Sequence, residues 1–483
     1  MSEGCGIVGI ALDEGDAVLP IFYALYALQH RGQESAGIAV SKSKSKGKEE
    51  ESGVNIPLIK GMGFVYEVFS PRRLESLEGK GNIGIGHVRY STTGASRAEN
   101  AEPLVVNYHR GQIAIAHNGN LVNAAELKSE LQREGRIFHS DTDTEVIAHL
   151  LAKELVRHDP IEAVKILMRR VVGSYSLVIL MDNSLIAIRD PLGIKPLCFG
   201  TLSDDKGYIV ASESSAIDTT GGDLIRDVRP GEVLIIHNTN KNRRLESYQL
   251  YRGINTAHCV FEYIYFARPD SVLDGRLVYD VRLKIGERLA EEHGIEADIV
   301  SPVPDSGITF AIGYAKRSGL DYMEGFIKNR YVGRTFIMPD ESYRDIAVRL
   351  KLNVVKRNVE GKQVVLVDDS IVRGTTSRQI VTFLKKKGAK KVHLRIGSPP
   401  IIAPCYLGIN TPTRDELLAS NRSMEAIRKF LNADSIGYLS LQGLIDSIGI
   451  SKNNLCLGCL NERYPVEIPG EVCVARQLKL SHF

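Results

Sequence analysis

A cysteine near the start of the chain is a candidate nucleophile. Cys5 is surrounded by Gly4, Gly6 and Gly9, which let the backbone turn tightly and let other groups come close. Taken as an isolated residue, Cys5 is interpreted as a small buried side chain, because free cysteine is among the most buried residue types. A base beside the thiol would instead make it a nucleophile. Motifs elsewhere in the chain are needed to distinguish a packing cysteine from a nucleophile.

A second chemical signal is the segment "VVLVDDSIVRGTTS", residues 364–377, in which an apolar strand runs into a polar loop that opens a helix. Backbone N–H groups and the helix dipole at such a helix start favour a phosphate group. The paired carboxylates of Asp368 and Asp369 suit vicinal ribose hydroxyls or hydrated Mg²⁺, and they are costly to bury without a partner. No Gly-Lys-Ser/Thr follows the strand, so this is not a P-loop.

The first half of the chain predicts short strands alternating with amphipathic helices. A hairpin is expected to turn near Asp182 and Asn183, and "GEVLIIHN" is expected to be the last strand of this part. The low-complexity stretch at 41–51 is interpreted as a solvated hairpin tip. The other expected strands are "CGIVGIAL", "SAGIAVS", "GNIGIGHVRYST" and "GQIAIAHNGNL", and the expected helices are "LPIFYALYALQH" and "DTEVIAHLLAKEL".

From about residue 258 the pattern becomes strand, loop and helix in turn, which predicts a doubly wound parallel sheet. An apolar stripe at Leu277, Val281, Ile285 and Leu289 indicates a helix, and "ADIVSPVPDSG" follows as a strand that ends in a loop. The polar, weakly patterned stretch 236–257 is the expected boundary between the two parts.

Composition restricts the possible functions. A chain of 483 residues with 43% apolar and 25% charged residues is expected to fold into two or three domains. A net charge of +3 is too close to neutral for nucleic acid as the main partner. Seven cysteines without a secretory signal indicate a reducing, cytoplasmic location, and no apolar run is long enough for a membrane span.

The 364–377 segment resembles the phosphoribosyl-pyrophosphate (PRPP) motif of type I phosphoribosyltransferases. In the same half, "PVPDSG" at 302–307 resembles their pyrophosphate loop, and 328–353 resembles the mobile basic flap that closes over PRPP. The flap would place basic residues near the phosphates, among them Arg334, Arg349 and Lys351. The resemblance implies Mg²⁺ at Ser306, Asp368 and Asp369. The implied PRPP-binding residues are Asp305, Ser306, Lys328, Arg330, Asp368, Asp369, Ser370, Arg373, Gly374, Thr375, Thr376 and Ser377.

The first half carries five motifs that resemble, in order and approximate spacing, the glutamine amidotransferase domain of N-terminal-nucleophile (Ntn) hydrolases. They are "CGIVGI", "HRGQESAGI", "GHVRYSTTG", "HNGNL" and "SDTDTE". With the phosphoribosyltransferase half attached, the chain resembles the glutamine PRPP amidotransferases from residue 5 to about 465. The implied fold is an α+β Ntn domain followed by an α/β type I phosphoribosyltransferase domain with a doubly wound, mostly parallel sheet.

This resemblance implies roles for residues of the first half. Asn118 and Gly119 would form an oxyanion hole, and Arg89 would bind the α-carboxylate of glutamine. Asp143 would bind the α-amino group, with Asp141 as the competing candidate, and Tyr90 with the "HRGQES" loop would help close the site. Removal of Met1 to Gly4 as a propeptide would give Cys5 a free α-amino group with a pKa of roughly 7.7 to 8.0, which could serve as the base.

Four further cysteines are candidate metal ligands. Cys456 and Cys459 form a Cys-x-x-Cys unit, and Cys259 and Cys405 would complete four thiolates for zinc or for an iron–sulfur cluster. The four positions match the ligands of a [4Fe-4S] cluster in the cluster-containing branch of the family, which favours iron–sulfur over zinc. Cys198 and Cys473 fit no motif and are interpreted as packing residues.

The sequence therefore predicts a propeptide at 1–4, a glutaminase domain at 5–236 and a phosphoribosyltransferase domain at 258–470. The predicted reaction converts glutamine, PRPP and water to 5-phosphoribosylamine, glutamate and pyrophosphate in purine synthesis, with ammonia passing between the sites. The resemblance also implies feedback inhibition by purine nucleotides and a homotetramer. The alternatives are a glucosamine-6-phosphate synthase, whose second half the PRPP motif argues against, a non-enzymatic PRPP sensor, and a cluster-binding scaffold.

Overall fold

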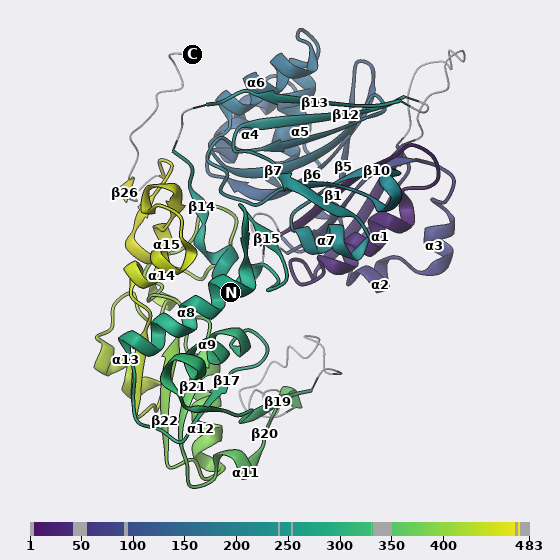
Figure 1. Cartoon of the computed structure of the whole chain (residues 1–483). Coiled ribbons are helices and arrows are strands. Elements are labelled where there is room, and N and C mark those ends of the chain that lie inside the picture. Colours follow the sequence, from purple (N-terminus) through teal and green to yellow (C-terminus); the bar gives the residue numbers. More distant parts are fainter. Residues whose placement is uncertain are drawn as a thin grey trace.

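The computed structural model describes residues 4–41, 56–90, 95–239, 242–252, 255–329, 331, 350–468 and 472–473. The first half contains two antiparallel sheets, seen edge-on in the upper part of Figure 1. One is seven-stranded, in the order β11 (Asp223–Asp227), β9 (Cys198–Thr201), β10 (Gly207–Ala211), β1 (Gly6–Leu12), β4 (Ile83–Arg89), β2 (Ser35–Ser41), β3 (Leu58–Met62). The other is six-stranded, in the order β13 (Asn242–Gln249), β12 (Glu232–Thr239), β8 (Ser184–Arg189), β7 (Gly173–Met181), β6 (Gly111–Leu121), β5 (Leu104–Tyr108).

The two sheets pack face to face, and helices cover both outer faces. Apolar side chains from both sheets, such as Ile85 on β4 and Val178 on β7, form one buried cluster between them. The seven-stranded sheet is covered by α1 (Val18–Ala27), α2 (Val65–Val68), α3 (Pro71–Glu75) and α7 (Ser214–Thr219). The six-stranded sheet is covered by α4 (Ala124–Arg133), α5 (Asp143–Glu154) and α6 (Pro160–Arg170). This four-layer arrangement confirms the α+β Ntn fold expected of the first half.

In this half the sequence predicts the turn of one hairpin correctly and the last strand wrongly. Asp182 and Asn183 have φ angles of 48° and 62°, the left-handed pair that a two-residue hairpin between β7 and β8 requires. The expectation that "GEVLIIHN" is the last strand is wrong, because β13 pairs with β12 along its whole length. Since β13 is a polar, half-exposed edge strand, its sequence carries little hydrophobic alternation. Most of the 41–51 insertion lies outside the described residues.

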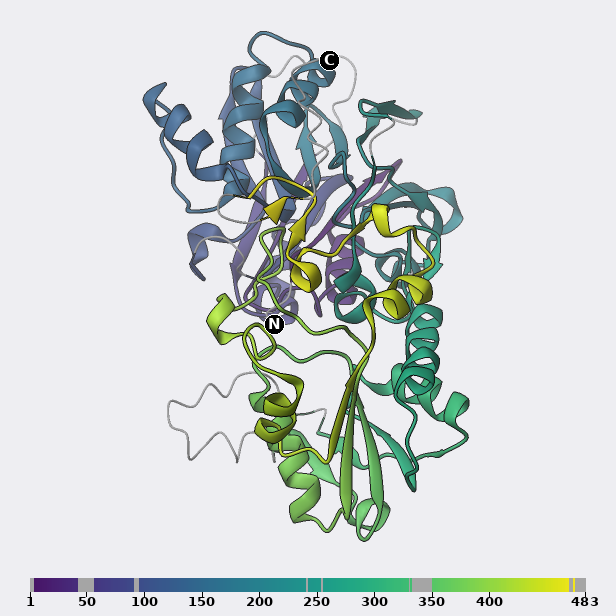
Figure 2. The same ribbon diagram turned by 90° about the vertical axis from the view of Figure 1, so that its left-hand side faces the viewer.

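The second half is built on a five-stranded parallel sheet, which confirms the doubly wound prediction; Figure 2 shows it below the first-half sandwich. The strand order is β18 (Asp321–Tyr322), β17 (Ile299–Pro302), β21 (Gln363–Asp368), β22 (Lys391–Ile396), β23 (Ser435–Tyr438). One face packs against α8 (Val278–Glu292) and α9 (Ile308–Ser318), the other against α12 (Thr375–Lys386) and α13 (Met424–Phe430). The loops after β17 and β21 leave the same edge of the sheet, where ligands bind in such folds.

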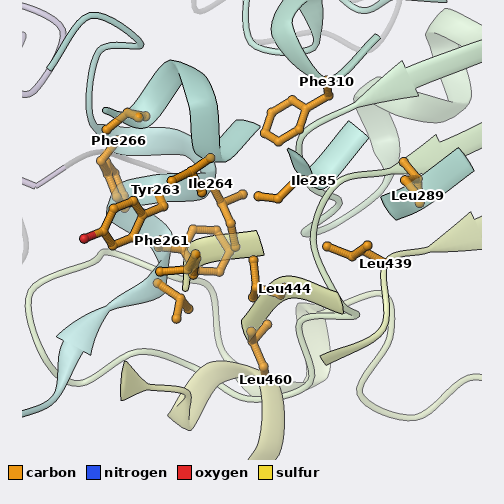
Figure 3. Packing of buried hydrophobic residues seen from close by; sticks show 14 of the residues in the cluster. Phe261, Tyr263, Ile264, Phe266, Ile285, Leu289, Phe310, Leu439, Leu444 and Leu460 are labelled. Carbon is orange, nitrogen blue, oxygen red and sulfur yellow. The ribbon is translucent and has the colours of Figure 1, made fainter. Parts of the chain in front are cut away.

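A short junction connects the halves. β14 (His258–Cys259) pairs in parallel with β24 (Leu455–Cys456), and a π-helix at Glu262–Phe266 follows β14. Phe261, Tyr263, Ile264 and Phe266 pack against side chains of α8, α9 and α14 (Leu441–Ile448), as Figure 3 shows. Within the described ranges, no helix has both the length and the apolar character needed to cross a membrane.

Helices α8 and α9 approach closely through glycines. A Cβ at Gly286 would lie 2.0 Å from the carbonyl oxygen of Phe310, and one at Gly313 would lie 2.2 Å from that of Leu283. Both clashes involve backbone atoms, so neither can be relieved by a rotamer change. The separation of the two helices therefore depends on these two residues having no side chain.

The substitution Gly286→Ala is expected to destabilise the second half by on the order of 3 kcal/mol, because the added methyl forces α8 and α9 apart. The apparent midpoint of thermal unfolding should fall by several degrees, and amides of α8 and α9 should exchange faster with solvent. Lys284→Ala, at an exposed position on the same helix, is the matched control and should change little. An unchanged midpoint for Gly286→Ala would contradict this packing.

Candidate active sites

A small cavity lies where the two sheets of the first half meet. Strand β1 follows Cys5, Arg89 ends the neighbouring strand β4, and β6 brings in residues of the other sheet. The cavity is lined by Cys5, Arg89, Glu102, His117, Gly119, Thr142, Asp143 and Thr144. The structure thus brings together four of the residues predicted from the sequence, Cys5, Arg89, Gly119 and Asp143. It also adds His117, Thr142 and Thr144, which lie within the quoted motifs but had no role assigned, and Glu102, which lies outside all five motifs.

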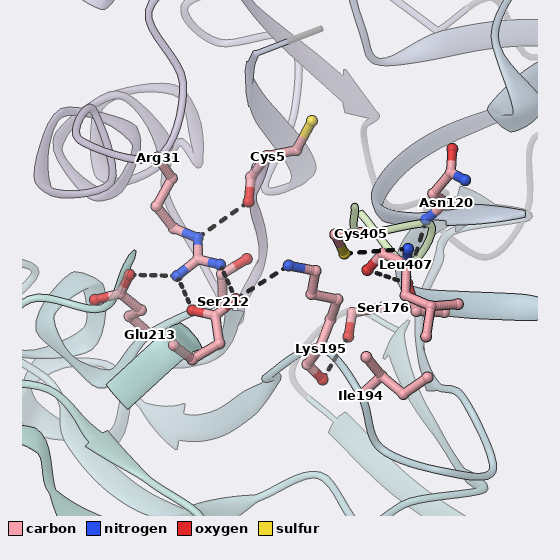
Figure 4. A network of polar contacts seen from close by, with 12 residues as sticks. Cys5, Arg31, Asn120, Ser176, Ile194, Lys195, Ser212, Glu213, Cys405 and Leu407 are labelled. Atoms are coloured by element: carbon pink, nitrogen blue, oxygen red, sulfur yellow. Dashed lines mark hydrogen bonds and ion pairs between the residues drawn. The ribbon is translucent and has the colours of Figure 1, made fainter. Parts of the chain in front are cut away.

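The Cys5 thiol is buried, and among the described residues its hydrogen bond goes to a backbone carbonyl group. Its Sγ atom is 3.7 Å from the carbonyl oxygen of Tyr90. Burial, with the nearby carboxylate of Glu102, raises the pKa of Cys5 to about 12 while residue 4 is still attached. The carbonyl oxygen of Cys5 accepts a hydrogen bond from Arg31 Nε at 3.0 Å, on the side away from the sulfur (Figure 4). In this form the thiol is protonated and unreactive at neutral pH.

Asn118 is a fully buried amide whose two polar atoms, Oδ1 and Nδ2, have no hydrogen-bond partner among the described residues. A Cβ placed on Gly4 would lie 3.6 Å from Oδ1 of Asn118, so the amide is next to the Gly4–Cys5 peptide. A Cβ on Gly119 would lie 2.0 Å from the carbonyl oxygen of Ser174, so position 119 has no room for a side chain. An unpaired donor beside a nucleophile is the arrangement that an oxyanion hole requires.

Asp143 is the first residue of α5 and belongs to a buried polar network. Its Oδ2 accepts the N–H of Leu121 at 2.8 Å, and its Oδ1 lies 3.6 Å from Nδ1 of His117. Glu102 accepts the N–H of His117 at 2.8 Å and the hydroxyl of Thr144 at 2.6 Å. Asp141, the competing candidate, is exposed and is not among the lining residues. Position in the cavity therefore favours Asp143.

The His117–Asp143 pair gives a pH-dependent contribution to stability. Burial alone would lower the pKa of His117, but the Asp143 carboxylate raises it, and the net result is a raised pKa. Because the folded pKa lies above the unfolded value of about 6.5, the stabilisation is complete below pH 6.5 and is lost as pH rises through the folded pKa.

Asp143→Asn should lower the pKa of His117 from its raised value, because the largest effect that opposes burial is removed, while Glu102 and the carbonyl oxygen of Ser174 still raise the pKa. The measurement is the pH titration of the His117 ring by NMR on histidine-labelled protein. Exposed His109 is the internal control, and its titration should not respond to the substitution. An unchanged His117 titration would mean that Asp143 does not act on this ring.

The second cavity, of about 310 Å³, lies at the carboxyl edge of the parallel sheet and brings together the second set of predicted residues. Gly374, with a φ of 75°, turns the chain into α12, so the first N–H groups of the helix open towards this cavity. Tyr265, from the π-helix at the junction, also lines it and was not predicted. The lining residues are Tyr265, Val303, Ser306, Asp368, Asp369, Ser370, Ile371, Val372, Arg373, Gly374, Thr375, Thr376, Ser377 and Ile380.

The two adjacent carboxyl groups of this cavity are both buried. Burial, with the adjacent carboxylate of Asp369, raises the pKa of Asp368 well above its ordinary value. Asp305 and Lys328 do not line the cavity; they form an ion pair with each other, with Nζ and Oδ2 2.5 Å apart. Among the other predicted phosphate ligands, Arg330, Arg334 and Arg349 lie outside the described residues.

The four candidate ligand cysteines come from three chain segments that meet at the junction. The β14–β24 pairing places Cys259 opposite Cys456, and the carbonyl oxygen of Cys459 accepts the N–H of Ile402, next to the Cys405 segment. Burial and the neighbouring thiols raise the pKa of Cys456 and Cys459. Backbone N–H groups of Phe261, Leu407 and Gly458 lie against the sulfurs of Cys259, Cys405 and Cys456 and act in the opposite direction.

In composition and surroundings these four thiols fit a thiolate-bound metal, because the sulfurs are buried and supported by N–H groups. In the described part of the chain, however, no group of three or more His, Cys, Asp or Glu side chains is placed as a ready ligand set. Cys198 is a buried packing residue on β9, as predicted, whereas the side chain of Cys473 is not described.

Comparison with known proteins covers almost the whole chain. The glutamine amidotransferase domain family matches residues 87–219. The amidophosphoribosyltransferase of Archaeoglobus fulgidus is 54% identical over 97% of this chain and 99% of that protein, and that of Bacillus subtilis is 45% identical over 97% and 95%.

Two solved structures are also similar to this chain along nearly its whole length. One is described as glutamine PRPP amidotransferase from B. subtilis complexed with ADP and GMP, and it superposes with a TM-score of 0.87 at 44% identity over 97% of this chain and 99% of that one. The other, described as the allosteric regulatory enzyme of purine biosynthesis, also gives a TM-score of 0.87 at 44% identity, over 96% and 97%. With both cavities present in one chain and relatives this similar along its full length, the chain belongs to the amidophosphoribosyltransferase family.

Proposed function

We propose that the chain converts glutamine, PRPP and water to 5-phosphoribosylamine, glutamate and pyrophosphate, the first committed step of purine synthesis. The observation that carries this function is the presence, in one chain, of a buried thiol cavity and a separate cavity at the Asp368–Ser377 loop. A PRPP sensor would not need the first cavity, and a cluster-binding scaffold would need neither.

In the glutamine half, the α-amino group of Cys5 would take the thiol proton, the thiolate would attack the side-chain amide carbon, and the proton would pass to the leaving nitrogen so that ammonia departs. Water would then hydrolyse the thioester to glutamate and restore the thiol. The oxyanion of the tetrahedral intermediate would accept hydrogen bonds from the unpaired side-chain N–H of Asn118 and from the backbone N–H of Gly119. Arg89 and Asp143, both lining the cavity, would bind the α-carboxylate and α-amino groups of glutamine, and Tyr90 would help close the site.

In the PRPP half, the start of α12 would hold the 5-phosphate through N–H groups and hydroxyls of Thr375, Thr376 and Ser377. The carboxylates of Asp368 and Asp369 would hold the ribose hydroxyls. Mg²⁺ fits the oxygen donors of Asp368, Asp369 and Ser306, and when bound it would neutralise charge on the pyrophosphate group. Ammonia arriving from the first cavity would then displace pyrophosphate from C1 of the sugar.

The high pKa of Cys5 supports the proposal that residues 1–4 are a propeptide. With Gly4 attached, burial and the Glu102 carboxylate raise the pKa of the thiol, whereas a chain beginning at Cys5 would carry its own α-amino base. Residues 1–3 lie outside the described part. For the rest of the chain we propose a glutaminase domain at 5–236, to which the structure adds the edge strand β13, and a phosphoribosyltransferase domain at 258–470.

We further propose that Cys259, Cys405, Cys456 and Cys459 bind a [4Fe-4S] cluster with a structural role, with zinc as the alternative. When bound, the cluster would cross-link three segments of the junction, and no step of the reaction passes through it.

Anaerobically purified protein is expected to contain about four iron and four sulfide per chain. Cys456→Ser should lose most of this metal, whereas Cys198→Ser, at a buried cysteine outside the junction, should keep it. Zinc without sulfide would establish the alternative, and the absence of both would refute the cluster.

Family membership also supports purine nucleotides as feedback inhibitors, a homotetramer and a cytoplasmic location. The B. subtilis structure described with ADP and GMP motivates the first of these. Inhibition assays with purine nucleotides and sedimentation of the purified protein test inhibition and assembly, and an uninhibited enzyme or a stable monomer would refute the corresponding proposal.

Glutamate release from glutamine should be strongly stimulated by PRPP and Mg²⁺ in a chain that begins at Cys5, as checked by intact mass. The full-length chain should release glutamate more slowly by a factor of at least about 10², because its thiol stays protonated. Both forms should use free ammonia with PRPP equally well, since that reaction does not need Cys5. PRPP-independent release would mean that the second half serves another acceptor, and equal release by the full-length chain would refute the propeptide.

A further inference from the structure

Arg31 joins the nucleophile to the second half of the chain. Its Nε donates to the carbonyl oxygen of Cys5 at 3.0 Å. Its two terminal nitrogens donate to Glu262 at 2.8 Å each, and one of them also donates to Glu213 at 2.6 Å. Arg31, Glu213 and Glu262 are 0–2% exposed, so water does not compete for these contacts. Figure 4 shows Arg31 between Cys5 and Glu213.

The charges around Arg31 form a balanced group, which we call the junction charge group: Arg31, Lys195, Glu213 and Glu262. The Nζ atom of Lys195 lies 3.3 Å from Glu262, and Glu213 also accepts the N–H of Arg268 at 2.9 Å and the hydroxyl of Ser271 at 2.7 Å. Burial alone would raise the pKa of Glu262, but the Arg31 and Lys195 cations hold it below its ordinary value. Burial alone would also raise the pKa of Glu213, but the His30 ring, 2.7 Å away, and the Arg31 cation hold it well below its ordinary value. Both glutamates are therefore ionised, and these four residues carry two positive and two negative charges.

Glu262 also belongs to an element that reaches the other cavity. It is the first residue of the π-helix Glu262–Phe266, and Tyr265 of the same five residues lines the PRPP cavity. Arg282 on α8 holds the π-helix in place through two hydrogen bonds, because it donates to the carbonyl oxygens of Tyr263 and Ala267 at 2.8 Å each. Tyr265, which lines the PRPP cavity, and Glu262, which contacts Arg31, therefore lie three residues apart on one short segment.

Stability alone is a weak reason for such a group, because apolar side chains of similar volume would stabilise a buried junction at least as well as paired charges. Paired charges add a defined geometry. The bidentate contact between the planar guanidinium and the Glu262 carboxylate fixes the direction of Nε, and with it the position of the Cys5 carbonyl group.

We propose that the Arg31–Glu262 ion pair is the contact through which occupancy of the PRPP cavity sets the position of Cys5 for glutamine hydrolysis. Arg31 and Glu262 are positioning residues, since neither lines either cavity. The inference rests on the proposed function and deepens it by naming the contact that would couple the two reactions.

The test is Glu262→Gln in the chain that begins at Cys5. Glutamine retains the volume but cannot accept both guanidinium N–H groups. PRPP should stimulate glutamate release about tenfold less than in the parent chain, and it should also accelerate alkylation of Cys5 by iodoacetamide less. Synthesis from free ammonia and PRPP should stay within about twofold, because the PRPP cavity keeps its own residues. Glu425→Gln, at an exposed glutamate paired with Arg428, is the matched control and should behave as the parent.

Because Glu262→Gln leaves one positive charge unbalanced, Glu262→Gln with Lys195→Met provides a charge-balanced second variant. If Glu262→Gln does not fold, the double variant tests the proposal instead. PRPP should again stimulate its glutamate release about tenfold less than in the parent chain. Normal stimulation in either folded variant would overturn the proposal. Loss of ammonia-dependent synthesis, or failure of both variants to fold, would also overturn the proposal, because the Arg31–Glu262 ion pair would then have a structural role. A parent chain that PRPP does not stimulate would instead refute the proposed function.

Discussion

A guanidinium group without access to water must have its N–H groups satisfied by protein atoms, and at Arg31 the partners come from distant parts of the chain. They are the carbonyl oxygen of Cys5, the carboxylate of Glu213 after β10, and the carboxylate of Glu262 in the π-helix of the junction. The cost of leaving any of these charges unpaired constrains how the halves can meet. Cys5 is consequently held by a side chain whose other partners come from both halves, although its cavity is lined by the first half alone.

The two cavities rest on different backbone geometries. In the first half, neighbouring antiparallel strands of one sheet bring Cys5 and Arg89 together, and a strand of the facing sheet supplies His117, Asn118 and Gly119. In the second half, parallel strands end at one edge and leave polar loops there, the place where ligands bind in open α/β sheets. A sandwich encloses a small buried site, whereas a sheet edge leaves a wider opening. This difference matches a small amide substrate in one half and a large, highly charged one in the other.

Much of this could be predicted because the informative residues are contiguous in sequence. The Asp368–Ser377 segment carries strand, carboxylates and helix start in one stretch, and the hairpin at Asp182 and Asn183 is equally local. The junction charge group could not be found in this way, because its partners are separated by as many as 231 residues, as in Arg31 and Glu262. Glu102 is similar, since its burial arises from contacts with His117 and Thr144 that no local pattern reveals. Strand β13 was missed for a different reason, namely that an exposed edge strand needs few apolar residues.

The parallel pairing of β14 with β24 has a consequence for the order in which the molecule is completed. Within the described residues, the two antiparallel sheets of the first half use no strand beyond Gln249, so a nascent chain can form them before the second half has been synthesised. The junction is different, because β14 at His258–Cys259 gains its partner only after residue 456 has emerged. Cys259 therefore waits for nearly two hundred residues of translation before Cys456 can lie opposite it. Cys456 and Cys459 are the last of the four junction cysteines to be synthesised.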